Sequence, residues 1–104
     1  MMFGLNEKTI NKINSVFIKY PEIEEVFIYG SRAKGNYKEG SDIDICLKGK
    51  NINETTCKRV SADLDDLNTP YFFDISTYHK ISNSSLLTEI SVNGQIFYQK
   101  EKNI

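Results

Sequence analysis

Long hydrophobic runs and an excess of charge of either sign are both missing from this 104-residue sequence. No apolar stretch comes near the roughly 20 residues that a membrane-spanning helix needs, and the first residues have no signal-peptide pattern. We therefore expect no membrane partner. The formal net charge of −1 offers no basic patch of the kind that nucleic-acid-binding proteins display. This argues against direct nucleic-acid binding and against a template-using polymerase.

Cysteine and histidine are also scarce, with two cysteines (Cys46 and Cys57) and the single histidine His79. The two thiols fit small core residues of a reduced, cytoplasmic protein better than they fit a disulfide. We interpret His79 as a surface residue. The hydrophobic fraction of 39% and the charged fraction of 26% are ordinary for a globular protein. The length is close to the common domain size, so residues 1–104 are expected to form one single domain.

Apolar residues at helical and strand spacings alternate along the chain. Helices are expected at residues 6–20, 31–34 and 54–67 and around 86–90, and strands at 26–29, 42–47, 71–76 and 95–99. Asn6 and Asn53 are the expected caps of the first and third helices, Ser82 or Ser84 that of the last, and residues 100–104 are an expected polar tail. The stripe Cys57, Val60, Leu64 and Leu67 is the expected buried side of its helix. This alternation predicts an α/β protein with one sheet flanked by helices, and leaves the strand order open.

The most informative pattern is Gly30-Ser31, then ten residues, then Asp42-Ile43-Asp44. Because side chains alternate along a strand, Asp42 and Asp44 are expected to share one face while Ile43 and Ile45 share the other. Two carboxylates about 7 Å apart at their Cα atoms can converge on a divalent cation. Oxygen ligands of this kind suit Mg²⁺, which usually takes one or two carboxylates together with phosphate oxygens of a substrate.

The turn at Gly30-Ser31 follows an apolar strand and precedes Arg32 and Lys34. Glycine allows close approach of the backbone, and free N–H groups at a helix start favour an anion. The pattern therefore predicts a phosphate-binding turn. Read without that context, Ser31 is a helix cap and the two cations are solvated. A phosphate cradle beside metal-binding carboxylates indicates phosphoryl or nucleotidyl transfer.

At these residues the chain resembles a known family. The stretches from Gly30 to Gly35 and from Gly40 to Asp44 are similar to the signature of the minimal nucleotidyltransferases (MNT), members of the DNA polymerase beta-like superfamily. The third carboxylate of that family lies on a later strand, where Asp74 is the candidate in this sequence. The resemblance extends over nearly the whole chain. It implies a small mixed β-sheet flanked by helices, of the polymerase beta palm type.

The resemblance also implies a chemistry. A magnesium-dependent enzyme of this kind would take a nucleoside triphosphate, with ATP as the expected one, and pass its nucleotidyl group to a hydroxyl. Gly30, Ser31 and Arg32 would hold the triphosphate. Asp42 and Asp44 would hold the metal ions, and Asp74 would help to bind the second metal and orient the acceptor. Read alone, Asp74 is a carboxylate in an apolar strand, costly there if it is buried without a partner.

Minimal nucleotidyltransferases are commonly encoded beside a small helical protein of the HEPN type, and can be antitoxins that add AMP to it. The resemblance thus implies a helical partner that completes the substrate site, and an oligomer with that partner. Two alternatives stay open. The chain is a binding module that neutralises its partner by occlusion, or it modifies a small molecule such as an aminoglycoside, although such enzymes usually carry an extra domain.

Overall fold

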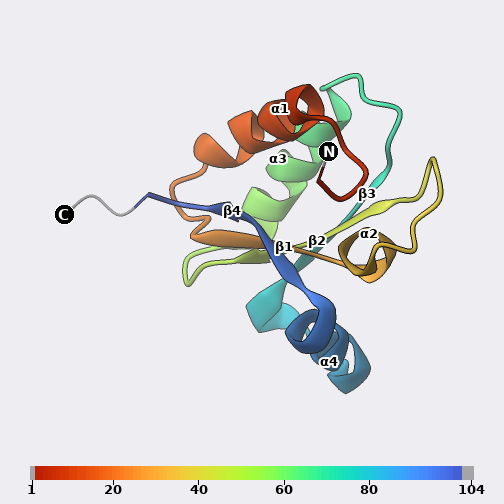
Figure 1. The fold of residues 1–104 in the computed structure, drawn as a ribbon. Coiled ribbons are helices and arrows are strands. Elements are labelled where there is room, and N and C mark those ends of the chain that lie inside the picture. The colour runs from red at the N-terminus through yellow and green to blue at the C-terminus, as the bar shows by residue number, and fades with distance from the viewer. Residues whose placement is uncertain (1, 102–104) are drawn as a thin grey trace.

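The structure is a computed structural model that describes residues 2–101 (Figure 1). One sheet has the strand order β3-β2-β1-β4. Its strands are β1 (Glu25–Tyr29), β2 (Ile43–Lys48), β3 (Phe73–Thr77) and β4 (Gln95–Gln99). β1 pairs antiparallel with β2 and β4, whereas β2 pairs parallel with β3. The sheet is therefore mixed, and β4 is an edge strand, as the sequence predicts.

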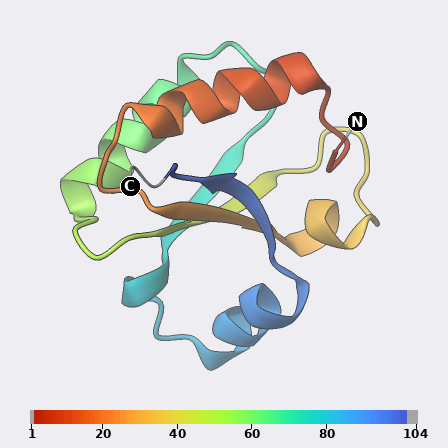
Figure 2. The same ribbon diagram turned by 60° about the vertical axis from the view of Figure 1, so that its left-hand side comes forward.

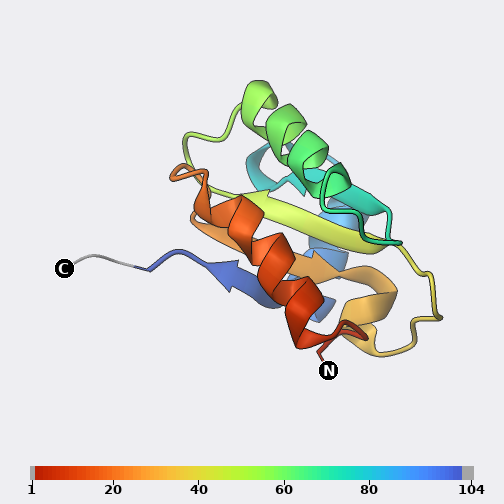
Figure 3. The same ribbon diagram turned by 90° about the horizontal axis from the view of Figure 1, so that it is seen from above.

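Helices cover both faces of this sheet. They are α1 (Glu7–Ile18), α2 (Gly30–Lys34), α3 (Glu54–Asp65) and α4 (Ser84–Asn93), with the short 3₁₀ helix η1 (Tyr78–Lys80) after β3. α1 and α3 lie side by side over one face (Figure 3), while α4 and η1 lie on the other (Figure 2). This confirms the predicted fold class, a small mixed sheet flanked by helices.

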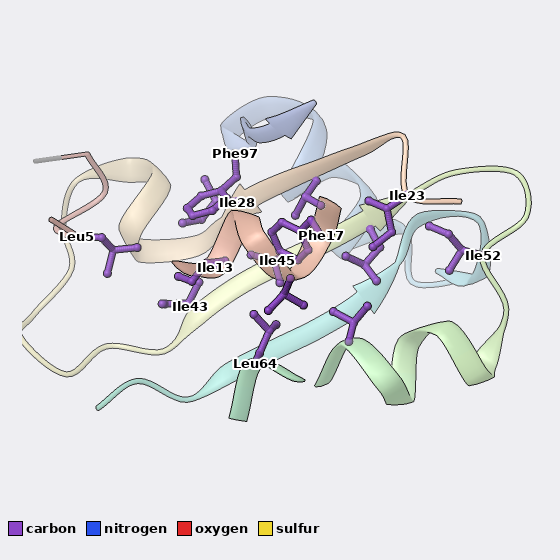
Figure 4. Packing of buried hydrophobic residues seen from close by; sticks show 14 of the residues in the cluster. Leu5, Ile13, Phe17, Ile23, Ile28, Ile43, Ile45, Ile52, Leu64 and Phe97 are labelled. Atoms are coloured by element: carbon purple, nitrogen blue, oxygen red, sulfur yellow. The ribbon is translucent and has the colours of Figure 1, made fainter. Parts of the chain in front are cut away.

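The main core fills the space between the sheet and the α1–α3 layer (Figure 4). Ile43, Ile45 and Leu47 of β2 are fully buried in it, as is Phe17 of α1. Since side chains alternate along a strand, the intervening residues of β2 point to the face that carries α4. The apolar alternation of β2 thus decides which face receives Asp44.

The second face has a smaller apolar cluster, in which Tyr29 and Cys46 pack with Ile90 of α4. α4 covers only part of this face. Asp44 is half-buried and Asp74 is exposed, because β3 is an edge strand whose outer face is open at this point. The carboxylates therefore lie at the uncovered end of a partly covered sheet face.

Several boundaries differ from the prediction. β2 begins at Ile43 rather than at Asp42, since the first pairing bond runs from the N–H of Ile43 to the carbonyl of Phe72, at 2.9 Å. α3 ends at Asp65, and β3 begins at Phe73. The predicted caps Asn6 and Asn53 are confirmed. Of the expected tail at 100–104, residues 102–104 lie outside the described part of the chain.

Two predictions about helices are wrong. Asn83, not Ser82 or Ser84, caps α4, and its side chain accepts from two backbone N–H groups of the first turn. In the first turn of α3, Thr56 is buried in place of the predicted Cys57, which is only half-buried. The Thr56 hydroxyl donates to Glu22 Oε2 at 2.7 Å. Both cysteines are free thiols. None of the helices described in residues 2–101 is long and apolar enough to cross a membrane.

Candidate functional site

The candidate site lies where β1 ends and where β2 and β3 begin. β1 runs directly into α2 at Gly30. In the sheet register Tyr29 is opposite Asp44, and Asp44 is opposite Asp74. These three residues therefore form one row across neighbouring strands, which are about 4.8 Å apart. The topology brings Asp44 and Asp74, from segments far apart in the sequence, beside the Gly30-Ser31 turn.

Gly30 makes this arrangement possible in two ways. Its φ of +71° lies in the left-handed region, which residues with a Cβ avoid. A Cβ atom at this position would also overlap the carboxylate oxygen Oδ2 of Asp44. The turn and the carboxylate are thus in direct contact, and a side chain at position 30 would force the Asp44 carboxylate to move.

Ser31 lies inside α2 and is half-buried. The residue at the cap position of this helix is Tyr29, which makes no side-chain capping hydrogen bond. Ser31 is therefore not the helix cap that the simpler interpretation of the sequence suggests. The N–H groups of a first helical turn have no partners within the helix, so this turn offers donors next to the carboxylates.

The electrostatics of the row are unfavourable without a cation. Burial first, and then the charges of Asp74 and Asp42, raise the pKa of the Asp44 carboxyl above its ordinary value. Burial likewise raises the pKa of Tyr29, and Asp74 and Asp44 add to this effect. A bound cation would stabilise the ionised form of Asp44 that the bare site disfavours.

The donor set fits Mg²⁺ in part. Asp44 and Asp74 provide two carboxylates on neighbouring strands, a usual number for a magnesium ion that also takes substrate phosphate oxygens. Asp42 lies in the loop before β2 and is exposed. Across residues 2–101, no three side chains of the His, Cys, Asp and Glu types are grouped closely enough to hold a metal ion. The residues therefore fit a magnesium site with two carboxylates, Asp44 and Asp74. Asp42, in the loop, is the candidate for a third.

Arg32 has partners that the sequence does not predict. Its side chain is only 3% exposed. Nε and Nη2 donate to the carbonyl of Ser41 at 3.1 and 2.9 Å, and Nη1 donates to the carbonyl of Phe3 at 2.9 Å. In this structure Nε, Nη1 and Nη2 all donate to protein carbonyls, and the contact of Arg32 with the triphosphate stays a prediction.

Neighbouring side chains hold α2 in place against the second face. Lys34 Nζ lies 3.6 Å from Glu89 Oε1 of α4, and the side-chain amide of Gln95 donates to the carbonyl of Ala33 at 2.7 Å.

The sequence analysis did not identify Tyr29 as the neighbour of Asp44 and Asp74 in this row across the sheet. Its position directly before Gly30 on a strand that pairs with β2 is the signal that identifies it.

Comparisons with known proteins identify the family and the fold. The family model described as "Polymerase beta, Nucleotidyltransferase" matches residues 11–103. No curated protein matches the chain. A solved toxin–antitoxin with AMP-PNP contains a chain of TM-score 0.70 and 18% identity, with coverage of 93% of this chain and 76% of that one.

Two further solved structures have the same fold. A structure of the toxin–antitoxin MntA–HepT gives a TM-score of 0.67 at 14% identity, and covers 91% of this chain and 74% of the other. A complex of a tri-AMPylated Shewanella oneidensis HEPN toxin with an MNT antitoxin also gives 0.67 at 14%, with coverage of 92% and 74%. These likenesses show the fold, and the family model shows the membership: this chain belongs to the polymerase beta nucleotidyltransferase family.

Proposed function

We propose that this protein is a magnesium-dependent nucleotidyltransferase that passes AMP from ATP to a hydroxyl group of a partner protein. The observation that carries the proposal is the direct contact between the Gly30 turn and the Asp44 carboxylate, with Asp74 next in the row. In a member of a nucleotidyltransferase family, this contact supports assigning the turn to the phosphates and the carboxylates to the metal.

The role that we propose for each residue follows from its place in the sheet. Gly30 and Ser31 at the end of β1 would hold the triphosphate, and Asp42 and Asp44 would hold magnesium. The ion, when bound, neutralises charge on the phosphates and on the attacking oxygen. Asp74 is on β3, on the side of Asp44 away from the turn. We therefore assign Asp74 to the second metal and to the acceptor.

The proposed reaction forms one bond and breaks one. The acceptor hydroxyl oxygen bonds to the α-phosphorus of ATP, and the bond from that phosphorus to the pyrophosphate oxygen breaks. The hydroxyl proton passes to Asp74 or to water. Positioning and charge neutralisation supply most of the catalysis in such transfers, and this matches a site that offers carboxylates and backbone donors.

The proposed partner is a small helical protein of the HEPN type, bound to this chain as an antitoxin binds its toxin. Support comes from the fold shared with complexes described as an AMPylated HEPN toxin with an MNT antitoxin, and as a toxin–antitoxin with AMP-PNP. The free thiols of Cys46 and Cys57 suit the cytoplasmic location that such a pair would have.

A second candidate function is neutralisation of the partner by occlusion alone. One observation favours it: Asp42 lies outside β2, and the described residues form no group of three metal-ligating side chains. In this case the protein would bind its partner tightly without transferring a nucleotide.

The deciding experiment uses the product of the neighbouring reading frame as acceptor, once that product is shown to be a small helical protein. The two proteins are mixed with ATP and Mg²⁺, and the acceptor is analysed by intact-mass spectrometry. We expect the mass of one or more AMP units, located on a hydroxyl side chain, and none with the Asp42→Asn, Asp44→Asn double variant. A stable complex whose acceptor gains no mass would support occlusion instead.

A further inference from the structure

We propose that Arg32 is a positioning residue that fixes Asp42 relative to the Gly30-Ser31 turn. This inference rests on the proposed function, since it assigns Asp42 to the metal. Arg32 is one residue from Ser31 along α2, and its guanidinium binds the residue that directly precedes Asp42. It therefore links the phosphate turn to the carboxylate loop.

The geometry of the link is rigid. Two donors of the guanidinium, Nε and Nη2, converge on the carbonyl oxygen of Ser41, while Nη1 reaches the carbonyl of Phe3 in the N-terminal turn. Because the guanidinium is planar and its donors form a fixed fork, the bond to Phe3 holds the guanidinium in place while the two bonds to Ser41 position the Ser41 carbonyl. The Ser41 carbonyl carbon is bonded to the backbone nitrogen of Asp42, so its position also constrains Asp42.

Besides the Arg32 fork, the loop before β2 contacts the body of the protein through the ring of Tyr37, which lies against Gly4 and the Arg32 guanidinium. Residues 35–40 are all exposed. The Ser41 N–H donates to the Lys38 carbonyl at 3.0 Å, and the Ser41 hydroxyl oxygen accepts from the Lys38 N–H at 2.9 Å, so both contacts stay inside the loop. The Arg32 fork is the contact that ties the end of this loop to α2.

The burial of Arg32 is itself costly, which argues for a specific role. The guanidinium carbon lies 4.8 Å from the ring centroid of Tyr71 and 5.3 Å from that of Tyr37. No ion pair of Arg32 with a carboxylate is present in residues 2–101. A buried charge needs compensation, and here three hydrogen bonds to carbonyls and two aromatic faces provide it. An apolar side chain would avoid that cost but would not hold Ser41.

The test measures metal binding and loop protection without any activity assay. Arg32→Lys keeps the charge but lacks the fork. We expect Mn²⁺ binding, followed by the electron paramagnetic resonance signal of the free ion, to weaken about tenfold, as for other residues that orient a metal ligand. Amide hydrogen exchange at Ser41 and Ile43 should accelerate. The matched control is Tyr20→Phe, which removes the part-buried hydrogen bond to Asp63 away from the site and should change neither readout.

A double-mutant cycle separates positioning from general destabilisation. In the Asp42→Asn background, Arg32→Lys should cause no further loss of Mn²⁺ affinity, because the ligand that it positions is already gone. An equal loss in both backgrounds would overturn the inference, as would an unchanged affinity and exchange rate in Arg32→Lys. If the unaltered protein binds no Mn²⁺, both the proposed function and this inference fail. If it binds Mn²⁺ and Arg32→Lys binds equally, only the inference fails.

Discussion

At the scale of single residues, the site depends on the close contact between the Gly30 backbone and the Asp44 carboxylate. Gly30 and Gly35 both have positive φ values, but only at Gly30 would a Cβ meet another group; at Gly35 nothing lies within 4 Å. Gly35→Ala is expected to cost roughly 1–2 kcal/mol of folding free energy, for left-handed backbone alone. Gly30→Ala should cost more, as measured by urea unfolding. In an Asp44→Ala background the excess should disappear. Equal costs for the two alanines in the unaltered background would contradict the contact.

Asp44 also predicts a pH dependence. Its pKa is raised in the folded protein by burial and by Asp74 and Asp42, so the neutral form is favoured by folding. The stability that this group contributes is full below the unfolded pKa, about 3.9, and is lost as pH rises through the folded value. In metal-free buffer at pH 7, Asp44→Asn should therefore be more stable than the unaltered protein, with the difference shrinking toward pH 4. A less stable variant at pH 7 would contradict this. Mg²⁺ should stabilise only the unaltered protein.

At the scale of elements, α4 limits how much of the carboxylate face is covered, and its start is set by one side chain. The Asn83 carboxamide oxygen accepts from the N–H groups of Ser85 and Leu86 at 2.9 and 3.1 Å. Asn83→Ala should lower the unfolding free energy by about 1 kcal/mol, whereas Ser84→Ala, one residue into the helix, should change it little. Thermal or urea unfolding of both variants is the measurement. A larger loss from Ser84→Ala would restore the cap that the sequence predicts.

The elements also show what a sequence predicts and where it fails. Local patterns predict β4 to the residue, and predict the caps Asn6 and Asn53, because periodicity and capping act over a few neighbouring residues. The start of β2 was misplaced because it depends on its partner strand, through the Phe72 carbonyl. The same holds for the site. Gly30 and Asp44 meet as their spacing suggests, but the carbonyl partners of Arg32 come from residues distant in sequence or from a loop, and no local pattern encodes them.

At the scale of the whole molecule, the carboxylate face is open and the net charge is only −1. Ligand sites usually bury most of their ligand, often between domains, so we expect a partner to complete this one. With little net charge to steer association, apolar contacts should carry much of the binding. Phe72 is a candidate for such a contact, since it is 76% exposed and lies two residues before Asp74, on the acceptor side of the row.

Phe72→Ser should therefore weaken binding of the helical partner at least tenfold, and slow transfer of AMP to it, because a large aromatic anchor is lost. Affinity for ATP with Mg²⁺ should not change, since the Gly30-Ser31 turn lies across the sheet. The matched control is Ile96→Ser, at a residue that is 51% exposed on β4, the opposite edge strand. Calorimetry with the partner and with ATP measures both affinities. Loss of ATP binding in Phe72→Ser would place this side chain on the nucleotide, and an equal partner defect in Ile96→Ser would remove β3 as the docking edge.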